Sequence, residues 1–346
     1  MEKMSTHNFG RRAVLSSLLP YLVMRPMVGA AQETAPQTSG TQQEKSIYNA
    51  LGTPGEFGLP QKSMVIKDKK DNVFFIWAPP KIKPEQSVGL VVFSAAELEL
   101  PESYSALLSL WASHGFVVVA PLPDDSVVRD GLLDMVSGQD PDIFWKKTEF
   151  GEKRAAAMSA ALDIVTTIEA TVRAEITDER PVAAGHGIGA YAAQLIAGTR
   201  AANGRGGWVA GADPRFYASL LLSPPGRGIL GLTKESWQTV KTPLFVSTGN
   251  GDSDASRQPP DVKTDSYSLP PPGNRHLAWL GRVNKTLWSG ESAGTNPIRA
   301  EIFGDILATT TGFIKAYGNY DETMLRFISG GAINRASQGR VAMFYR

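Results

Sequence analysis

The segment that most limits the possible folds of this chain begins at residue 181 and reads PVAAGHGIGAYAAQL. It predicts a short buried strand over 181–185 and a helix over 188–199. The turn between them contains three alternating glycines, Gly185, Gly187 and Gly189. Glycine at every second position indicates that side chains are excluded there. The chain should therefore bend sharply, and the helix should pack close to the strand.

Strands and helices alternate along most of the chain. Apolar runs predict strands over 63–66, 73–77, 89–94, 116–120, 181–185, 218–223, 244–248 and 276–280. Periodic patterns predict helices over 103–113, 152–172, 188–199 and 296–317, and a long connection with little periodicity over 121–150. The alternation predicts an α/β fold, with a mainly parallel sheet flanked by helices and an antiparallel hairpin at its start. Sheets of this kind bind their ligands at the carboxyl ends of the strands.

The first 31 residues have the features of an export signal. Arg11 and Arg12 follow a polar stretch, an apolar run covers 13–24, and small residues come next as a possible cleavage site. The apolar run is shorter than the ~20 residues that span a bilayer, and no transmembrane segment is expected in the mature chain. The paired arginines resemble a twin-arginine signal, with an ordinary secretory signal as the alternative. We expect an exported protein, periplasmic or secreted.

The rest of the chain divides by composition. Residues 32–47 are polar and predict a linker, 48–320 contain the alternating elements, and 321–346 form a C-terminal extension. The extension ends in VAMFYR, an apolar and β-prone run. It either adds a strand to the protein's own sheet or docks on a partner.

Composition excludes several kinds of site. The chain has 346 residues and no cysteine, which excludes disulfides, thiolate nucleophiles and cysteine-based metal sites. Its net charge of +1 gives no electrostatic argument for nucleic acid or an anionic membrane. A dinucleotide site needs G-x-G-x-x-G, whereas the spacing here is G-x-G-x-G. We expect no cofactor, no metal and no nucleic-acid partner, and we leave open whether the partner is a small molecule or a protein.

The glycine turn and its surroundings resemble one branch of a known family. The run GHGIGAYAAQLIAG is similar to the nucleophile turn of α/β-hydrolases of the dienelactone-hydrolase and chlorophyllase-like branch, where the apex of G-x-S-x-G is serine. Further pieces of similarity are GLVVFS, ASHGFVVVAP, FYASLLLSPPG and KTPLFVSTGNGD, so the resemblance covers about residues 55–317. It implies an α/β-hydrolase fold.

The resemblance also implies positions for a catalytic triad, and here the chain departs from the family. Serine hydrolysis needs a nucleophile, an orienting acid and a histidine base. The apex is Gly187, which has no side chain to react, and Asn284 stands where the branch commonly has histidine. Asp252, with Asp254 as second choice, is at the acid position, although Gly, Asn and Asp there also suit a plain turn. No histidine follows His276, so Gly187, Asp252 and Asn284 are triad-equivalent positions only.

Candidate binding residues flank the two turns at the expected site: Ala95, Ala96 and Glu97 after the third strand, and His186 and Ile188 beside the apex. Carboxylates of Glu97 or Glu99 would oppose a developing oxyanion rather than stabilise it. Ser94 and Ser223 end other strands, where the strain of a nucleophile turn is not expected.

We therefore expect a hydrolase-like protein that is inactive as a serine hydrolase and acts as a ligand-binding or accessory protein. The alternative is a carboxylic-ester hydrolase with non-standard catalytic groups. In that case Glu97 or Glu99 would act as a base on water, and Lys285 would contribute a charge.

Overall fold

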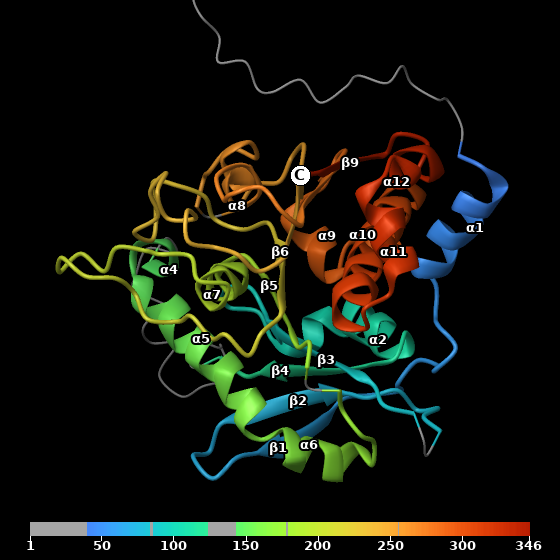
Figure 1. Ribbon diagram of the computed structural model, residues 1–346, viewed down its shortest axis with the longest axis horizontal. Helices are drawn as coiled ribbons and strands as arrows, with labels where there is room; N and C mark the ends of the chain where they lie inside the picture. The colour runs from blue at the N-terminus through green and yellow to red at the C-terminus, as the bar shows by residue number, and fades with distance from the viewer. Residues whose placement is uncertain (1–39, 84–85, 124–142, 178, 255) are drawn as a thin grey trace, which may run out of the picture. The chain divides into compact units, whose positions relative to one another are not determined.

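The protein is described by a computed structural model that covers residues 40–83, 86–123, 143–177, 179–254 and 256–346. These residues contain a nine-stranded sheet in the order β1-β2-β4-β3-β5-β6-β7-β8-β9 (Figure 1). Its strands are β1 (Met64–Lys67), β2 (Val73–Trp77), β3 (Gly89–Ser94), β4 (Phe116–Pro121), β5 (Val182–His186), β6 (Ala218–Leu222), β7 (Leu244–Gly249), β8 (Arg275–Leu280) and β9 (Val341–Tyr345).

The sheet is mixed but mostly parallel, as the sequence predicts. Neighbouring strands from β4 through β3, β5, β6 and β7 to β8 run parallel. The pairs β1–β2, β2–β4 and β8–β9 are antiparallel, so the predicted hairpin at the start is confirmed. This architecture is compatible with an α/β-hydrolase-like fold. The carboxyl ends of the parallel strands meet at one edge, where β3 and β5 pair in the register Ser94↔Gly185.

Helices cover both faces of the sheet (Figure 1). On one face lie α1 (Gln42–Leu51), α2 (Ser105–Ser113), α9 (Lys285–Ser289), α10 (Pro297–Gly318), α11 (Glu322–Ser329) and α12 (Ala332–Ala336). On the other lie α4 (Ile143–Lys146), α5 (Thr148–Asp163), α6 (Val165–Val172), α7 (Ile188–Ile196) and α8 (Asp265–Ser268). Three 3₁₀ turns complete the elements: η1 (Pro101–Tyr104), η2 (Val262–Thr264) and η3 (Ala293–Thr295).

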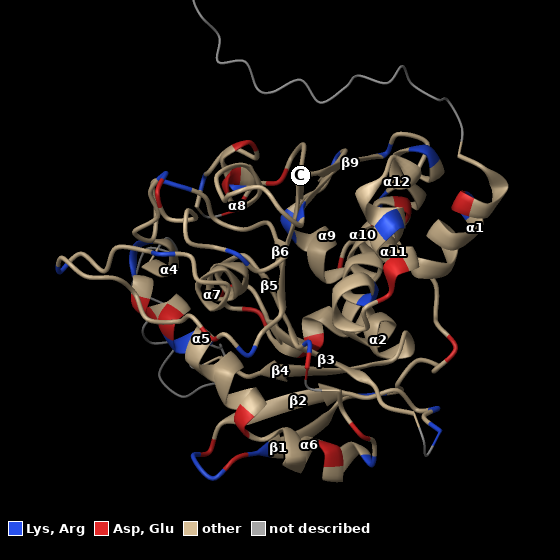
Figure 2. Cartoon of the chain, in the orientation of Figure 1, with Lys and Arg blue, Asp and Glu red and all other residues tan. Residues whose placement is uncertain are grey.

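The central strands are buried along their whole length because helices cover both of their faces. Every residue of β3, β4, β5, β6 and β7 is buried, whereas the edge strand β1 alternates between half-buried and exposed positions. Charged side chains are accordingly scattered over helices and loops and are rare on the central strands (Figure 2). The near-continuous apolar runs of the sequence reflect this two-sided burial.

One predicted helix is interrupted. The sequence predicts a single helix over 152–172, but α5 ends at Asp163 and α6 begins at Val165, with a bend of 61° between them. The break falls in the run IVTTI, where β-branched residues lose side-chain freedom in a helix. No described helix is by itself long and apolar enough to cross a membrane, and α5 and α6 reach that length only as a bent pair.

The segments that flank the predicted domain are structured where they are described. Helix α1 begins at Gln42, inside the range 32–47 that predicts a linker, and Thr41 and Glu44 form a capping box at its start. At the other end, α11 packs on α10, α12 packs on α1 and α11, and β9 adds a strand to the sheet beside β8. Strand β8 is therefore not the last strand of the sheet. The described residues between 40 and 346 form one compact unit.

Two predictions lie outside the described residues. The export signal of residues 1–31 is one of them, together with most of the linker. The second is most of the long connection, since its residues 124–142 are not described.

Candidate functional site

The glycine turn between β5 and α7 has the geometry that the sequence predicts. Gly187 adopts φ 56° and ψ −119°, a conformation that side-chain-bearing residues rarely adopt. A Cβ on Gly185 would lie 2.2 Å from the carbonyl oxygen of Gly189, and one on Gly189 would lie 2.0 Å from that of Ser94. Strand, turn and helix therefore pack backbone to backbone. A residue with a side chain does not fit at either outer position.

Glu97 fills the space at the apex of this turn. A Cβ on Gly187 would lie 2.9 Å from Oε2 of Glu97, 3.5 Å from Cβ of Ala96 and 3.8 Å from Cη2 of Trp145. The Glu97 side chain is only 4% exposed. A carboxylate thus stands where a nucleophile turn would present its serine hydroxyl.

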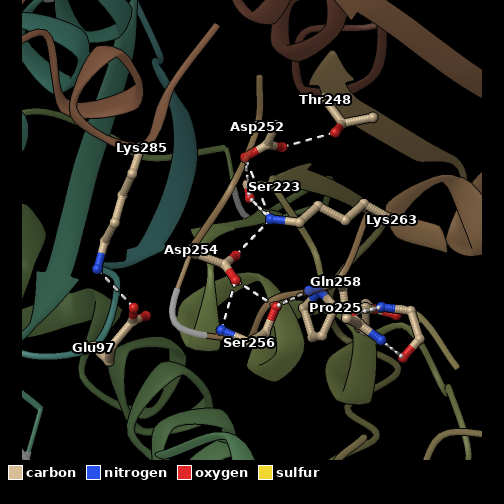
Figure 3. Close-up of polar contacts among 12 residues, drawn as sticks. Glu97, Ser223, Pro225, Thr248, Asp252, Asp254, Ser256, Gln258, Lys263 and Lys285 are labelled. Atoms are coloured by element: carbon tan, nitrogen blue, oxygen red, sulfur yellow. Dashed lines mark hydrogen bonds and ion pairs between the residues drawn. The ribbon is translucent and has the colours of Figure 1, made fainter. Parts of the chain in front are cut away.

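Lys285 is the ion-pair partner of Glu97. Its Nζ donates a hydrogen bond of 2.7 Å to Oε1 of Glu97, reaching it from the start of α9 (Figure 3). Burial alone would lower the pKa of Lys285, but the charge and hydrogen bond of Glu97, together with Glu99 and Asp254, raise the pKa above its usual value. Lys285 therefore supplies an ammonium to the apex from the loop after β8. In the α/β-hydrolases that the sequence resembles, this loop carries the histidine base.

His186 is buried beside the apex and faces the fold. Its Nδ1 lies 2.6 Å from the hydroxyl of Tyr104, and that oxygen also accepts a hydrogen bond of 3.3 Å from the backbone N–H of Ala96. The hydrogen bond with Tyr104 therefore holds the His186 ring in place. Burial, with smaller effects of Lys285 and Lys263, holds the pKa of His186 well below its ordinary value. His186 is a neutral, positioned ring.

The segment after β3 is held in place by Arg154, a residue of α5. Its guanidinium donates to the carbonyl oxygens of Ala95 and Ala96 at 2.5 and 3.2 Å, and to the Ser94 hydroxyl at 3.3 Å. Since the Ala96 N–H is bonded to Tyr104, this segment holds one of its donors in an internal contact. The five candidate binding residues are all buried and lie on the two turns: Ala95, Ala96, Glu97, His186 and Ile188.

Asp252 is buried, but its carboxylate is used within a separate network. Oδ1 accepts from the Ser223 hydroxyl at 2.8 Å and from Nζ of Lys263 at 3.3 Å, and Oδ2 accepts from the Thr248 hydroxyl at 2.7 Å (Figure 3). Lys263 is 0% exposed and also donates to Asp254 at 2.5 Å and to Ser223 at 2.7 Å. The candidate acid thus stabilises a buried lysine and is no plain solvated turn.

Ser223 differs from the expectation for its strand end. Its φ is 48°, so the backbone adopts the left-handed region that the sequence did not predict there. The Ser223 hydroxyl donates to Asp252 and accepts from the Lys263 ammonium. An ammonium that donates to the hydroxyl has no lone pair with which to remove its proton, so Lys263 does not act as a base on Ser223.

Asn284 serves as the N-cap of α9. Its side-chain oxygen accepts from the backbone N–H of Leu287 at 3.1 Å and from the Thr286 hydroxyl at 3.1 Å. The described contacts join none of the triad-equivalent positions Gly187, Asp252 and Asn284 to one another. Each has a local role instead: backbone turn, buried anion and helix cap.

Comparison with known proteins adds no family. No protein-family model matches this chain, and no curated protein is significantly similar to it.

Three residues of the site could not be assigned from the sequence. Arg154 lies on a helix whose pattern predicted only amphipathic packing, Tyr104 lies in a 3₁₀ turn, and Lys263 follows an irregular loop. Of these three, only Arg154 gave a signal in the sequence, because a basic side chain stood within an apolar helical stripe. That signal did not identify the partner of Arg154. Among the described residues, no group of three or more His, Asp or Glu side chains is arranged to hold a metal ion. The described residues of the site offer buried charge and hydrogen bonding, and Gly187 brings no side chain to the apex.

Proposed function

We propose that this chain is a non-catalytic relative of the dienelactone-hydrolase and chlorophyllase-like α/β-hydrolases, which uses the carboxyl ends of its strands to bind a ligand. The observation that carries the proposal is the Glu97 carboxylate at the apex of the glycine turn, 2.9 Å from where a Cβ on Gly187 would lie. The place of the serine hydroxyl is thereby taken by a carboxylate that is already paired with Lys285, whereas serine hydrolysis needs a hydroxyl that a histidine base activates.

Two further observations support a binding role over hydrolysis. The N–H of Ala96 is bonded to Tyr104, so an oxyanion would have to compete for that donor. The candidate acid Asp252 has a buried lysine as its cationic partner, and no histidine is bonded to it. Each catalytic part has been replaced by a contact within the fold, whereas the turn itself is kept.

An ester hydrolase with a carboxylate base is the second candidate. Oε2 of Glu97 is buried at the apex with no hydrogen-bond partner among the described residues, and a base on water needs such a free oxygen. Against it, the ammonium of Lys285 is bonded to the other oxygen and stabilises the carboxylate as an anion. Such a pair favours a fixed charge over a group that takes up a proton during turnover.

The experiment is a turnover assay of the purified protein with p-nitrophenyl acetate and p-nitrophenyl butyrate. We expect a rate equal to that of buffer, and the same rate for Glu97→Gln. Turnover above buffer that disappears in Glu97→Gln would establish the carboxylate-base hydrolase and contradict the binding proposal.

We also propose that the protein is exported, on the basis of Arg11, Arg12 and the short apolar run behind them. The experiment is fractionation of cells that express the full chain or the double variant Arg11→Lys, Arg12→Lys. Twin-arginine export predicts that the variant stays inside the cell with its leader attached. Export of both chains would indicate the general secretory route, and retention of both would contradict export.

A further inference from the structure

We infer that the ligand of this site carries a primary ammonium group and that Glu97 is the residue that binds it. The inference rests on the proposed function, because it names the ligand class of the same site. It begins from Oε2 of Glu97, which has no hydrogen-bond partner among the described residues. The side chain is 96% buried and its free oxygen faces the apex of the turn. A buried carboxylate oxygen without a donor is costly, so a ligand that brings an N–H to it is stabilised.

Lys285 shows which chemistry this carboxylate accepts. Its ammonium already donates to Oε1 at 2.7 Å, while its side chain is 34% exposed. Lys285 is therefore a partly exposed ammonium of the chain itself that is already bound to this carboxylate. An amine ligand would add to it at Oε2 or displace it from Oε1. An acidic ligand would instead meet the Glu97 carboxylate at the apex.

The surrounding charges also favour a cation. Among the described residues, Glu97 and Glu99 at the apex are matched in number by Lys285 and Arg154, and an excess of one carboxylate comes from the neighbouring network of Asp252, Asp254 and Lys263. The raised pKa of Lys285 reports the same excess, since three of these carboxylates together outweigh the effect of burial on it. Lys263 lies between Asp252 and Asp254, so this network holds one more carboxylate than cations, and Asp254 also acts on Lys285 (Figure 3).

The indole of Trp145 borders the same space. Its Cη2 would lie 3.8 Å from a Cβ on Gly187, and the side chain is 4% exposed. Tryptophan attracts cations more strongly than the other aromatic residues. A carboxylate oxygen and an indole together suit an ammonium that can both donate a hydrogen bond and contact a ring. A quaternary ammonium lacks the N–H that Oε2 requires, so the primary amine is the expected form.

The test is isothermal titration calorimetry of the full chain at constant ionic strength with three ligands of similar size. n-Butylammonium should bind at least tenfold more tightly than butyrate, and at least tenfold more tightly than butyltrimethylammonium. Butyrate binding as tightly as the amine would overturn the inference. Equal binding of the primary and the quaternary cation would overturn the assignment of Oε2 as the acceptor.

Variants locate the site. Glu97→Gln keeps the shape of the side chain and removes its charge. It should weaken the binding of butylammonium at least tenfold. Lys285→Met removes the internal ammonium and should strengthen the binding of butylammonium at least tenfold. Lys285→Arg keeps a cation at this position and should not strengthen that binding. The exposed Lys234→Met is the control and should change nothing. If Lys285→Met does not fold, the ligand selectivity of the wild-type protein and the affinity of Glu97→Gln still test the inference. Full binding by Glu97→Gln would overturn the inference.

The inference and the proposed function fail in different ways. Ester turnover would contradict the proposed function, whether or not butylammonium binds. A protein without turnover that prefers butyrate would keep the binding function and refute only the amine. The two experiments use the same purified chain.

Discussion

At the scale of single residues, the three glycines of the turn differ in what they tolerate. The neighbour that a Cβ on Gly187 would meet is the far end of the Glu97 side chain, which can move, whereas a Cβ on Gly189 would meet the backbone of β3. Gly187 has a positive φ, and Gly189 does not. Conformational strain therefore disfavours a side chain at Gly187, and steric overlap disfavours one at Gly189.

We expect Gly189→Ala to cost about 3 kcal/mol or more in the free energy of unfolding, because the β3 backbone must shift. Gly187→Ala should cost about 1–3 kcal/mol, because a residue with a side chain must keep a sparsely populated backbone conformation of positive φ. Urea unfolding of both variants measures the difference. Equal losses, or a larger loss at Gly187, would show that the close packing of turn and strand is not as described.

The buried lysine gives a second prediction at this scale. Lys263→Met leaves Asp252 and Asp254 buried without their cation, and we expect a loss of about 3–5 kcal/mol in the free energy of unfolding. The control is Arg326→Met, which breaks the exposed pair with Glu322 and should cost less than about 1 kcal/mol. Similar losses for the two variants in urea unfolding would mean that the network around Asp252 is solvated.

At the scale of elements, the sequence predicted the strands of the parallel sheet well and the polar networks poorly. Two-sided burial produces continuous apolar runs, and such runs are visible without a structure. The bonds of Arg154 and Lys263 join residues 58–60 and 9–40 positions apart, and no local pattern encodes them. The positive φ of Ser223 likewise depends on contacts with β7 and η2, since serine alone gives no signal for it.

Strand β9 shows how an ambiguous terminal run is decided by packing. Val341 and Met343 face the core, while Phe344 and Tyr345 are exposed. The alternation places one side of the run against the helices α11 and α12, and its backbone pairs with β8. The predicted choice between an added strand and a docking segment therefore resolves to an added strand.

The two sides of β9 make a matched test. Met343→Ala should lower the free energy of unfolding by about 2–5 kcal/mol, because it leaves a cavity beneath the strand. Phe344→Ala, at the neighbouring exposed position, should change it by about 0.5 kcal/mol or less. Thermal or urea unfolding compares them directly. A larger loss at Phe344 would place that side chain in an interface and argue for a partner on this strand.

At the scale of the whole molecule, three buried histidines make the fold sensitive to acid. Burial lowers the pKa of His114 and of His186, and lowers the pKa of His276 from 6.5 to about 3. The unfolded chain takes up these protons near pH 6.5, whereas the folded chain does not. Each such histidine therefore favours unfolding as pH falls below about 6.5, by up to about 1.4 kcal/mol per pH unit.

We expect the urea midpoint to be constant from pH 8 to about 7 and to fall steadily between pH 6.5 and 5. Asp265, whose pKa is raised by burial, acts in the opposite direction, but it is one group against three histidines. The measurement is the midpoint at half-unit steps of pH. A midpoint that stays constant or rises as the solution is made more acidic would contradict the burial of these rings.

The central claim is that no side chain at the strand ends acts as a nucleophile. It is tested most directly by intact-mass spectrometry after incubation with a fluorophosphonate, beside an active serine hydrolase as positive control. The account predicts an unchanged mass for this protein under conditions in which the control is fully labelled. A stoichiometric adduct that peptide mapping places on Ser223 or Ser94 would contradict it.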